Sequence, residues 1–328
     1  MSSETDYIFK VTNLKKWFPF RTGLMSSFSG TKEYVRAVDN ISFEVKKGEV
    51  VCLVGESGSG KTTAARLILR LEDVTEGQIL FKGTDITELK QSKVRKLRKD
   101  MQIVFQNPYE SLDPRMTIYE ILSEPLRVLK VCKGAEIMER VVKALEDVGL
   151  TPAQEFNHRY PHELSGGQRQ RVSIARALIV EPEFIVADEP ASMLDANTRI
   201  EILNLLEDLQ NEYKMGILFI THDLAQARYL GDTLILLYLG KIIEKGNINL
   251  VIKSPHHPYT QALISNVPVP DPDAQRTRME IEGEIPTAVR LPPGCRFAPR
   301  CPNVFDKCRE EEPELMMKHG RLSACWLD

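Results

Sequence analysis

Short runs of apolar residues, or of alternating apolar and polar residues, recur along the chain with the length and composition of β-strands. They lie at residues 7–14, 36–45, 49–55, 78–83, 101–106, 184–188, 216–221, 233–240 and 241–246. Segments with helical spacing lie between several of them, at 61–71, 117–130, 135–148, 167–180 and 197–213. Strands that alternate with helices predict an α/β fold with a mostly parallel sheet covered on both faces. Short connections within the first and last pairs of strands suit an antiparallel flank.

Two stretches depart from this alternation. Between Gln106 and Gly166 the pattern is helical without strands, which predicts an inserted helical subdomain at about 107–166. From about Lys253 prolines cluster, as in "SPHHPY" and "VPVPDPD", and they predict a linker followed by a separate, loop-rich terminus. We therefore expect two parts, residues 1–252 and residues 253–328.

Composition changes this picture little. The 328 residues are 42% hydrophobic and carry a formal net charge of -3, so nothing calls for a polyanionic partner, although specific nucleic-acid binding is not excluded. The longest apolar runs, such as "TLILLYL", are far shorter than the roughly 20 residues that span a bilayer. Met1 leads into "SSETDY", without a basic start or an apolar signal segment. We expect a cytoplasmic chain whose membrane association comes through a partner.

The segment "GESGSGKTT" has the pattern of a phosphate-binding loop. It follows an apolar strand and precedes a helix, so its glycines let backbone N–H groups approach phosphate oxygens at a positive helix end. Lys61 is expected to reach the β- and γ-phosphates, and Thr62 to place its hydroxyl on Mg²⁺. The alternative is a glycine-rich turn with a solvated lysine. The predicted nucleotide-binding residues here are Gly55, Ser57, Gly58, Ser59, Gly60, Lys61, Thr62 and Thr63.

Two carboxylates follow a second buried strand. In "FIVADEP" the strand ends at Asp188 and Glu189, where chemistry usually lies in such sheets. Asp188 is expected to hold Mg²⁺ through water, and Glu189 to take a proton from an attacking water. Two adjacent acids alone are equally typical of a solvated turn.

The segment "LSGGQRQR" predicts a second anion-binding helix start. Ser165 has the character of an N-cap, which a structural role explains fully. The paired glycines, Gly166 and Gly167, weaken a helix start unless the backbone must be approached closely. A simple explanation is that this helix end serves the nucleotide of another subunit.

These segments, together with Gln106, "SMLD" at 192–195 and His222, resemble the ABC-type ATPases in their order and spacing. The resemblance covers roughly residues 7–250 and implies a P-loop NTPase fold. It also implies a head-to-tail dimer, in which each ATP lies between one subunit's phosphate loop and the other's Ser165, Gly166, Gly167 and Gln168.

The resemblance also implies roles for single residues. Trp17 should stack on adenine, Gln106 should touch Mg²⁺ or the attacking water, Asp195 should link the two sites, and His222 should contact the γ-phosphate. The catalytic residues would be Glu189, His222 and Gln106. Each has an alternative: Trp17 as a core aromatic, Gln106 as an ordinary strand end, and His222 with its neighbour Asp223 as a helix cap.

Four of the six cysteines lie near the end of the sequence. Since disulfides are disfavoured in a reducing cytoplasm, their clustering indicates metal or redox chemistry. The tail resembles the C-terminal extension of the oligopeptide and dipeptide branch of ABC importers, which implies a [4Fe-4S] cluster; Zn²⁺ and unmetallated thiols are the alternatives. Cys52 and Cys132 are expected to be core or surface thiols. The expected ligands are Cys295, Cys301, Cys308 and Cys325.

The leading hypothesis is the ATP-hydrolysing energy-coupling subunit of a peptide importer, peripheral on the cytoplasmic face of the membrane. Its partners would be a second ABC ATPase subunit, two membrane permease subunits and an extracytoplasmic solute-binding protein, with no nucleic acid. Tyr109, Leu112, Met116 and Ile118 are candidates for a groove that receives the permease, with a core role as the alternative for Ile118 and Leu122. Alternatives are an oligosaccharide importer, a soluble ABC ATPase acting on nucleic acid or ribosomes, and a nonhydrolytic nucleotide sensor.

Overall fold

The computed structural model describes residues 6–20, 33–267 and 286–327, together with residues 279, 281 and 283. Most of the proline-rich "VPVPDPD" stretch expected to be a linker lies outside the described residues. The chain divides into two compact units, each assembled from several segments. The first comprises Met1–Phe9, Val45–Val50 and Phe81–Ile220, and the second comprises Lys10–Glu44, Val51–Leu80 and Thr221–Asp328.

Three parallel strands form the sheet of the first unit, in the order β8-β7-β6. They are β6 (Met101–Val104), β7 (Phe184–Asp188) and β8 (Gly216–Thr221), and every residue of β7 and β8 is buried. Val104 pairs with Ala187, and Asp188 with Ile220. Because the strands are parallel, the residues that follow β6 and β7 lie at the same edge of this sheet.

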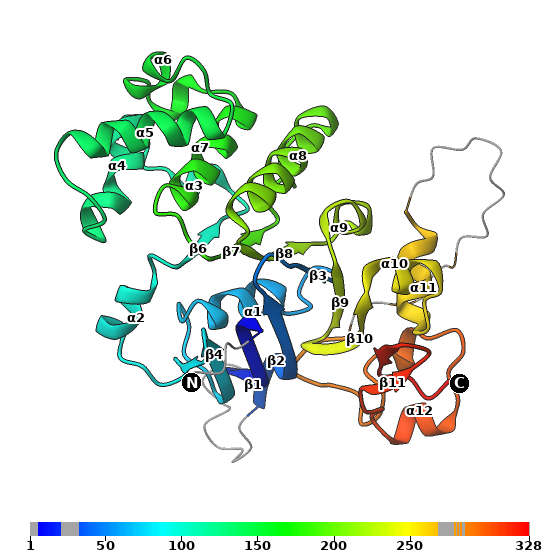
Figure 1. Cartoon of the computed structure of the whole chain (residues 1–328). Coiled ribbons are helices and arrows are strands. Elements are labelled where there is room, and N and C mark those ends of the chain that lie inside the picture. Colours follow the sequence, from blue (N-terminus) through cyan, green and yellow to red (C-terminus); the bar gives the residue numbers. More distant parts are fainter. Residues whose placement is uncertain are drawn as a thin grey trace, which may run out of the picture. The chain divides into compact units, whose positions relative to one another are not determined.

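The first unit also contains a helical group, in which the central α7 contacts α3, α4 and α5 (Figure 1). A capping box between Thr117 and Glu120 begins α4, and its apolar face, including Ile121 and Leu126, is buried. The elements are β5 (Thr84–Asp85), α2 (Gln91–Leu97), α3 (Pro108–Ser111), α4 (Ile118–Val128), α5 (Ala135–Asp147), α6 (Ala153–Asn157), a 3₁₀ turn (Pro161–Glu163), α7 (Gly166–Leu178) and α8 (Ala196–Tyr213).

The second unit holds two sets of neighbouring strands, β2-β1-β4 and β3-β9-β10-β12-β11. In the second set β3 runs parallel to β9, whereas β10 is antiparallel to both β9 and β12. This arrangement supplies the expected antiparallel flank. The strands are β1 (Tyr7–Phe20), β2 (Glu33–Lys46), β3 (Val50–Val54), β4 (Glu76–Phe81), β9 (Thr233–Tyr238), β10 (Lys241–Asn247), β11 (Met316–Lys318) and β12 (Arg321–Ser323).

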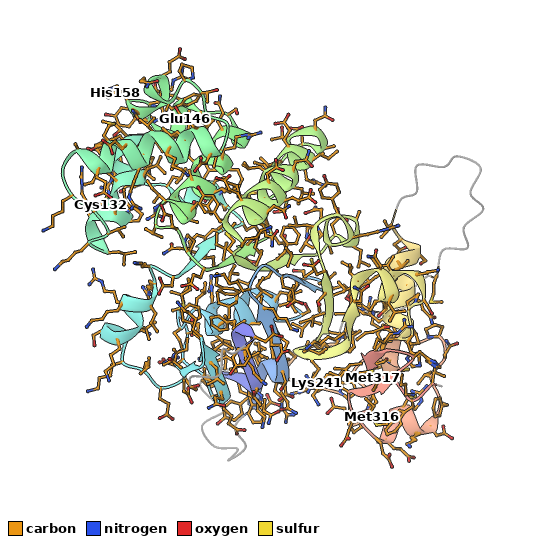
Figure 2. The ribbon with its side chains drawn as sticks, viewed as in Figure 1. Cys132, Glu146, His158, Lys241, Met316 and Met317 are labelled. Atoms are coloured by element: carbon orange, nitrogen blue, oxygen red, sulfur yellow. The ribbon has the colours of Figure 1, made fainter. Side chains whose placement is uncertain are left out.

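The C-terminal residues of the second unit are more regular than the expected loop-rich terminus. Ser323 of β12 pairs with Glu244 of β10, so the tail extends the sheet. The edge strand of this extension is β11, which carries the exposed Met316 and Met317 (Figure 2). The helices of this unit are α1 (Lys61–Ile68), α9 (Leu224–Leu230), α10 (Ile248–Lys253), α11 (Pro258–Ser265), a 3₁₀ turn (Ala298–Arg300) and α12 (Asp306–Glu310).

Glu244 fixes the start of this extension. Its fully buried carboxylate accepts hydrogen bonds from the backbone N–H groups of His256 and His257, at 2.9 and 3.0 Å, and lies 3.7 Å from the guanidinium of Arg321. A buried charge requires such partners. The "SPHHPY" segment is therefore anchored to the sheet.

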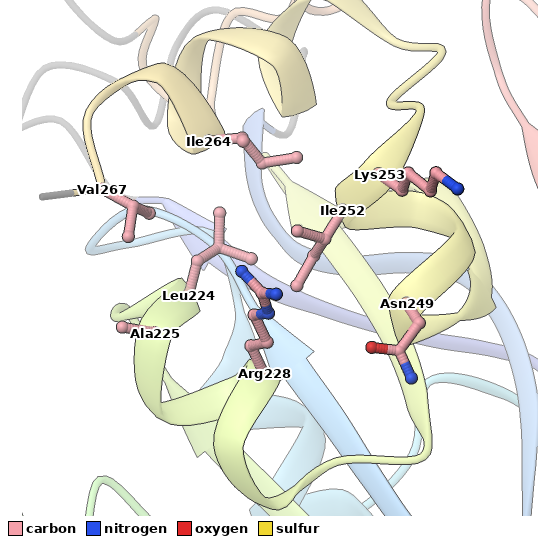
Figure 3. A pocket seen from close by; sticks show the side chains of 8 residues that line it. All are labelled: Leu224, Ala225, Arg228, Asn249, Ile252, Lys253, Ile264 and Val267. Atoms are coloured by element: carbon pink, nitrogen blue, oxygen red, sulfur yellow. The ribbon is translucent and has the colours of Figure 1, made fainter. Parts of the chain in front are cut away.

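A cavity of about 500 Å³ lies among α9, α10 and α11 (Figure 3). Apolar side chains, including Leu224, Ile252 and Ile264, line it together with the cationic Arg228 and Lys253. It contains none of the predicted nucleotide-binding residues. Across the described ranges, none of the helices is both long and apolar enough to cross a bilayer.

Candidate functional site

The phosphate loop lies between β3 and α1, and two of its glycines are required by close backbone contacts. A Cβ added to Gly55 would lie 2.2 Å from the carbonyl oxygen of Leu237, and one added to Gly60 would lie 2.0 Å from that of Ala37. Gly60 also has a φ of +105°, a conformation that L side chains rarely adopt. Glycine at positions 55 and 60 is therefore a packing requirement of the loop.

The interior of the loop is polar and fits an anion. The buried ammonium group of Lys61 donates hydrogen bonds to the carbonyl oxygens of Gly55 and Glu56, at 2.7 and 2.9 Å. The Ser59 hydroxyl oxygen is buried without a hydrogen-bond partner in the described structure. Since buried polar groups are normally satisfied, this hydroxyl suits a ligand that brings its own acceptors. Phosphate oxygens meet that requirement.

Trp17 is half-buried near the end of β1, so it is not a core aromatic. Its indole N–H donates a hydrogen bond to Asp39 at 3.1 Å, and the guanidinium of Arg36 lies 4.9 Å from the ring centroid. A partly exposed indole held by its polar edge can present a ring face to a flat ligand.

Gln106 and Glu189 meet at the edge of the first unit's sheet. The Gln106 side-chain amide donates to the Glu189 carboxylate at 3.0 Å. Glu189 has a φ of +48°, and its backbone N–H donates to the carbonyl of Ile220 at 2.9 Å. Asp188, immediately before it, is buried at the end of β7. The two adjacent acids are thus fixed at a strand end and do not form a plain solvated turn.

Ser165 caps α7 as expected, through a capping box with Gln168 whose two hydrogen bonds measure 3.0 and 3.2 Å. A Cβ on Gly167 would lie 2.5 Å from Cγ2 of Thr198, whereas one on Gly166 would make ordinary contact, 3.6 Å from Leu194. Packing against α8 therefore explains Gly167 but not Gly166.

Asp195 and His222 lie beside helix starts. Asp195 caps α8, accepting hydrogen bonds from the backbone and the hydroxyl of Thr198 at 3.1 and 2.7 Å, and the hydroxyl bond is the main reason that the Asp195 pKa is lowered. Asp223, rather than His222, caps α9 by accepting from the N–H of Ala225 at 2.8 Å. His222 is exposed.

The predicted site residues fall in both units. Trp17, the phosphate loop, His222 and the four C-terminal cysteines belong to the second unit, and the remaining residues belong to the first. Within the first unit the structure joins Gln106 to Glu189, and within the second it holds Trp17 through Asp39.

Ile118 and Leu122 are buried, so the core interpretation is correct for these two, whereas the groove candidate Leu112 is buried but lines the hollow beside Tyr109. Tyr109 is 64% exposed, and the guanidinium of Arg169 lies 4.2 Å from its ring centroid. A hollow of about 560 Å³ beside it is lined by residues that include Tyr109, Met116, Ile121 and Arg176.

The C-terminal cysteines influence one another electrostatically. Burial raises the pKa of Cys295 to about 11, and the nearby Cys308 and Cys325 add to the shift. Burial likewise raises the pKa of Cys301 and of Cys325. Cys52 is buried in β3, and Cys132 follows α4 (Figure 2), so neither joins this group.

The structure does not support the expected metal centre. In the portion of the chain that is described, no group of three or more His, Cys, Asp or Glu side chains has a geometry that could hold a metal ion. Burial raises the pKa of Cys295, Cys301 and Cys325, with a further contribution from the charge of Cys308, yet the four thiols do not form such a group.

Known proteins resemble this chain over nearly all of its length. The family model for ABC transporters matches residues 38–192, and the model for the oligopeptide/dipeptide transporter C-terminal region matches residues 243–308. The oligopeptide transport ATP-binding protein AppF of Bacillus subtilis is 46% identical over 95% of this chain and 94% of its own. The dipeptide transport ATP-binding protein DppF of Haemophilus influenzae is 42% identical over 98% of this chain and 97% of its own. The chain belongs to the ABC transporter ATP-binding family.

Solved structures of this family agree with the fold. An ATP-binding cassette captured as a dimer after hydrolysis, with ADP and Pi, matches with a TM-score of 0.63 and 32% identity over 73% of this chain and 98% of the cassette. The cassette cbiO1 of Clostridium perfringens, part of an ABC transporter complex, matches with a TM-score of 0.65 and 30% identity over 76% of this chain and 92% of its own. This ABC protein is an ATPase with the P-loop NTPase fold.

Sequence reasoning missed several residues of this ABC ATPase that touch the nucleotide-binding segments. Arg296 and Arg300 lie between two of the cysteines, and their side chains reach Asp39 and Glu56. The signal was present as two arginines in the otherwise uncharged "GCRFAPRCP".

Proposed function

We propose that this ABC ATPase is the energy-coupling subunit of an importer for oligopeptides or dipeptides. The observation that carries the proposal is the presence, on one chain, of an ABC transporter match and an oligopeptide/dipeptide transporter C-terminal match. The names of the peptide-transport relatives support the same substrate class. An oligosaccharide importer is the alternative within this class.

The phosphate loop is proposed to hold the triphosphate. Lys61 and the loop N–H groups would bind the β- and γ-phosphate oxygens, and the buried Ser59 hydroxyl would donate to one of them. Trp17 would stack on adenine. Thr62 and Asp188, with Gln106, would hold Mg²⁺, which when bound neutralises charge on the phosphates.

Glu189 is proposed to accept the proton of the attacking water. Its hydrogen bond with Gln106 fixes the carboxylate at the end of β7, where a general base requires a defined orientation. His222, exposed just before α9, would contact the γ-phosphate.

The working ATP site is proposed to be shared by two subunits. A bound triphosphate would repel a second anionic surface, so closure of the dimer needs favourable new contacts. The N-terminal end of α7 from the opposite subunit would provide them, through Ser165, Gly166, Gly167 and Gln168. Asp195 would link the two sites. The second subunit is a related ATPase or another copy of this chain.

The membrane partners are proposed to be two permease subunits, supplied with cargo by a solute-binding protein. The hollow beside the exposed Tyr109 is the proposed receiving site for a permease segment. The chain would then be peripheral on the cytoplasmic face of the membrane. Copurification distinguishes an importer subunit from a soluble ABC ATPase, because recovery with permease subunits would favour the first and recovery with ribosomes or nucleic acid the second.

In this proposal residues 1–252 form the nucleotide-binding domain, with a helical subdomain at about 107–166, and residues 253–328 form the transporter-type extension. A [4Fe-4S] cluster or Zn²⁺ in the extension stays a prediction, supported only by the mutual electrostatic influence of the thiols. Anaerobic purification tests it: equal iron and labile sulfide would indicate a cluster, zinc alone would indicate the alternative, and neither would exclude both.

Complementation tests the shared site. Lys61→Met removes the phosphate-loop cation, and Gly166→Asp places a negative charge at the helix start where a Cβ has room. Each variant alone should be inactive as a homodimer. Mixed, the two form a heterodimer with one intact site, so ATPase activity should return. Absence of recovery, or wild-type turnover per chain that is independent of protein concentration, would contradict the shared site.

A further inference from the structure

Arg300 of the extension holds the side chain of a phosphate-loop residue. Its guanidinium lies 2.9 and 3.4 Å from the two carboxylate oxygens of Glu56, the second residue of the loop. The Arg300 side chain is 9% exposed and that of Glu56 is 23% exposed, so the pair is largely removed from water. Two-point pairing of this kind fixes direction as well as distance.

Tyr259 holds the same loop residue by its backbone. The fully buried Tyr259 hydroxyl accepts a hydrogen bond from the N–H of Glu56 at 3.0 Å. Its ring packs against Tyr238 and Phe297, with centroid separations of 4.9 and 5.5 Å. Residues of the extension therefore restrain Glu56 at both its backbone and its carboxylate.

Arg296 reaches the other end of the proposed ATP site. Its buried guanidinium donates to the carboxylate of Asp39 and to the carbonyl of Leu239, and lies 3.1 Å from Glu312. Asp39 in turn accepts the indole N–H of Trp17 at 3.1 Å. Trp17 is thus connected to the extension through one carboxylate.

The phosphate loop and Asp39 both contact the turn between β9 and β10. The N–H of Gly240 donates to the carbonyl of Ser59 in the phosphate loop at 2.8 Å, and the N–H of Asp39 donates to the carbonyl of Gly240 at 2.9 Å. The turn therefore touches the loop, Asp39 and Arg296 together.

We propose that Arg300 and Arg296 are positioning residues for ATP, through which the extension sets the two ends of the nucleotide site. Arg300 fixes the phosphate loop through Glu56, and Arg296 fixes Trp17 through Asp39. Neither arginine needs to touch the nucleotide. The proposal rests on the proposed function, because it takes Trp17 as the adenine contact and the loop as the phosphate contact.

The test is equilibrium binding to the full-length chain with two probes, Mg-ATP and Mg-tripolyphosphate, the second of which has no base. Arg300→Met should weaken both probes by the same factor, about tenfold, because it loosens the phosphate end. Arg296→Met should weaken Mg-ATP by a similar factor but leave tripolyphosphate unchanged. Arg309→Met, at an exposed arginine of α12, is the matched control and should bind both probes as wild type does.

A second readout follows Trp17 directly. The chain has two tryptophans, so Trp326→Phe leaves Trp17 as the single fluorophore. Mg-ATP should quench the emission of Trp17. At saturating Mg-ATP, Arg296→Met should reduce this quenching, whereas Arg300→Met should not. Where an arginine variant fails to fold, Glu56→Gln or Asp39→Asn breaks the same pair with little change in volume and carries the same expectation.

The possible results distinguish failure of the positioning roles from failure of the proposed function. Folded arginine variants that bind both probes with wild-type affinity overturn the positioning roles and leave the proposed function standing. Equal weakening of both probes by Arg296→Met overturns its assignment to the adenine end. A wild-type chain that binds neither probe overturns the proposed function, and the positioning roles with it.

Discussion

The side-chain amide of Gln106 donates a hydrogen bond to the carboxylate of Glu189 at 3.0 Å. The two residues follow neighbouring parallel strands, β6 and β7, whose register is fixed by pairs such as Val104 with Ala187. Since Gln106 also begins the span that leads into the helical group, movement of that group would act on the carboxylate through this bond. Gln106 therefore contacts the proposed base directly and lies shortly before Tyr109 of the proposed receiving surface in the sequence.

Replacing Glu189 tests the proposed base. Glu189→Gln keeps the shape and a hydrogen bond to Gln106 but cannot accept a proton, so the ATPase rate should fall by at least about 100-fold while Mg-ATP affinity is retained. Steady-state hydrolysis and nucleotide titration measure the two effects. Glu183→Gln, just before β7 and paired with Lys82 at the surface, is the control and should keep full turnover. Unchanged turnover in Glu189→Gln would favour the nonhydrolytic sensor or another base.

The two glycines at the start of α7 should respond differently to alanine. Gly167→Ala should lower the free energy of unfolding by about 1–3 kcal/mol, because its Cβ meets Thr198 Cγ2 and the Thr198 hydroxyl is held by Asp195. Gly166→Ala has room and should be near neutral. Urea unfolding measures both. Adding Thr198→Ser, which removes only the methyl group, should restore the Gly167→Ala variant, and failure to restore it would contradict the packing explanation.

Glu244 should be essential for the stability of the extension. Glu244→Ala leaves two buried backbone N–H groups without their acceptor and the buried Arg321 guanidinium without its counter-ion, and it should cost about 3–5 kcal/mol. Chemical unfolding and limited proteolysis of the full chain provide the measurement. Glu314→Ala, at an exposed position, is the matched control. Equal stability of the two variants would show that the buried pair contributes nothing.

His257 should make folding sensitive to acid. Burial lowers its pKa from 6.5 to about 3, so the folded chain keeps it neutral while the unfolded chain protonates it below pH 6.5. A lowered pKa means that stability is fully present above pH 6.5 and is lost as pH falls toward 3, by at most about 1.4 kcal/mol per pH unit from this group. His257→Asn retains an acceptor for the N–H of Tyr259 and should flatten this slope in unfolding measured from pH 7 to 5. An unchanged slope would assign the acid sensitivity to other groups.

Hydrophobic patterning predicted the central strands well because they are buried on both faces. The run at 184–188 corresponds to all of β7, and the run at 216–221 to all of β8. The first strand was underestimated: it was expected to end at residue 14 but continues to Phe20, through two successive lysines and the run "WFPF", which do not alternate. Strands β11 and β12 have only three residues each; β12 forms by pairing with β10 and β11 by pairing with β12, a tertiary cause that local pattern does not contain.

The phosphate loop could be predicted because its chemistry is local: glycines, lysine and hydroxyl lie within nine consecutive residues. Other features of the site depend on distant partners. The bond between Arg300 and Glu56 spans 244 positions, and no periodicity or spacing encodes it. Gly167 appeared unusual for a helix start, and only the structure identifies the methyl group of Thr198 that excludes a larger residue.

The carbonyl oxygens of Leu237 and Ala37 leave no space for a Cβ atom at Gly55 and Gly60. These backbone contacts within the protein should hold the phosphate loop in shape without help from a ligand. Little ordering entropy then remains to be lost on capture, and an isolated chain should hold nucleotide readily. ATP binding and ATP hydrolysis would then be separate events: one chain would bind ATP by itself, and hydrolysis would require association with a second subunit. In the proposed shared site, the rate of hydrolysis would depend on how often two ATP-bound subunits associate.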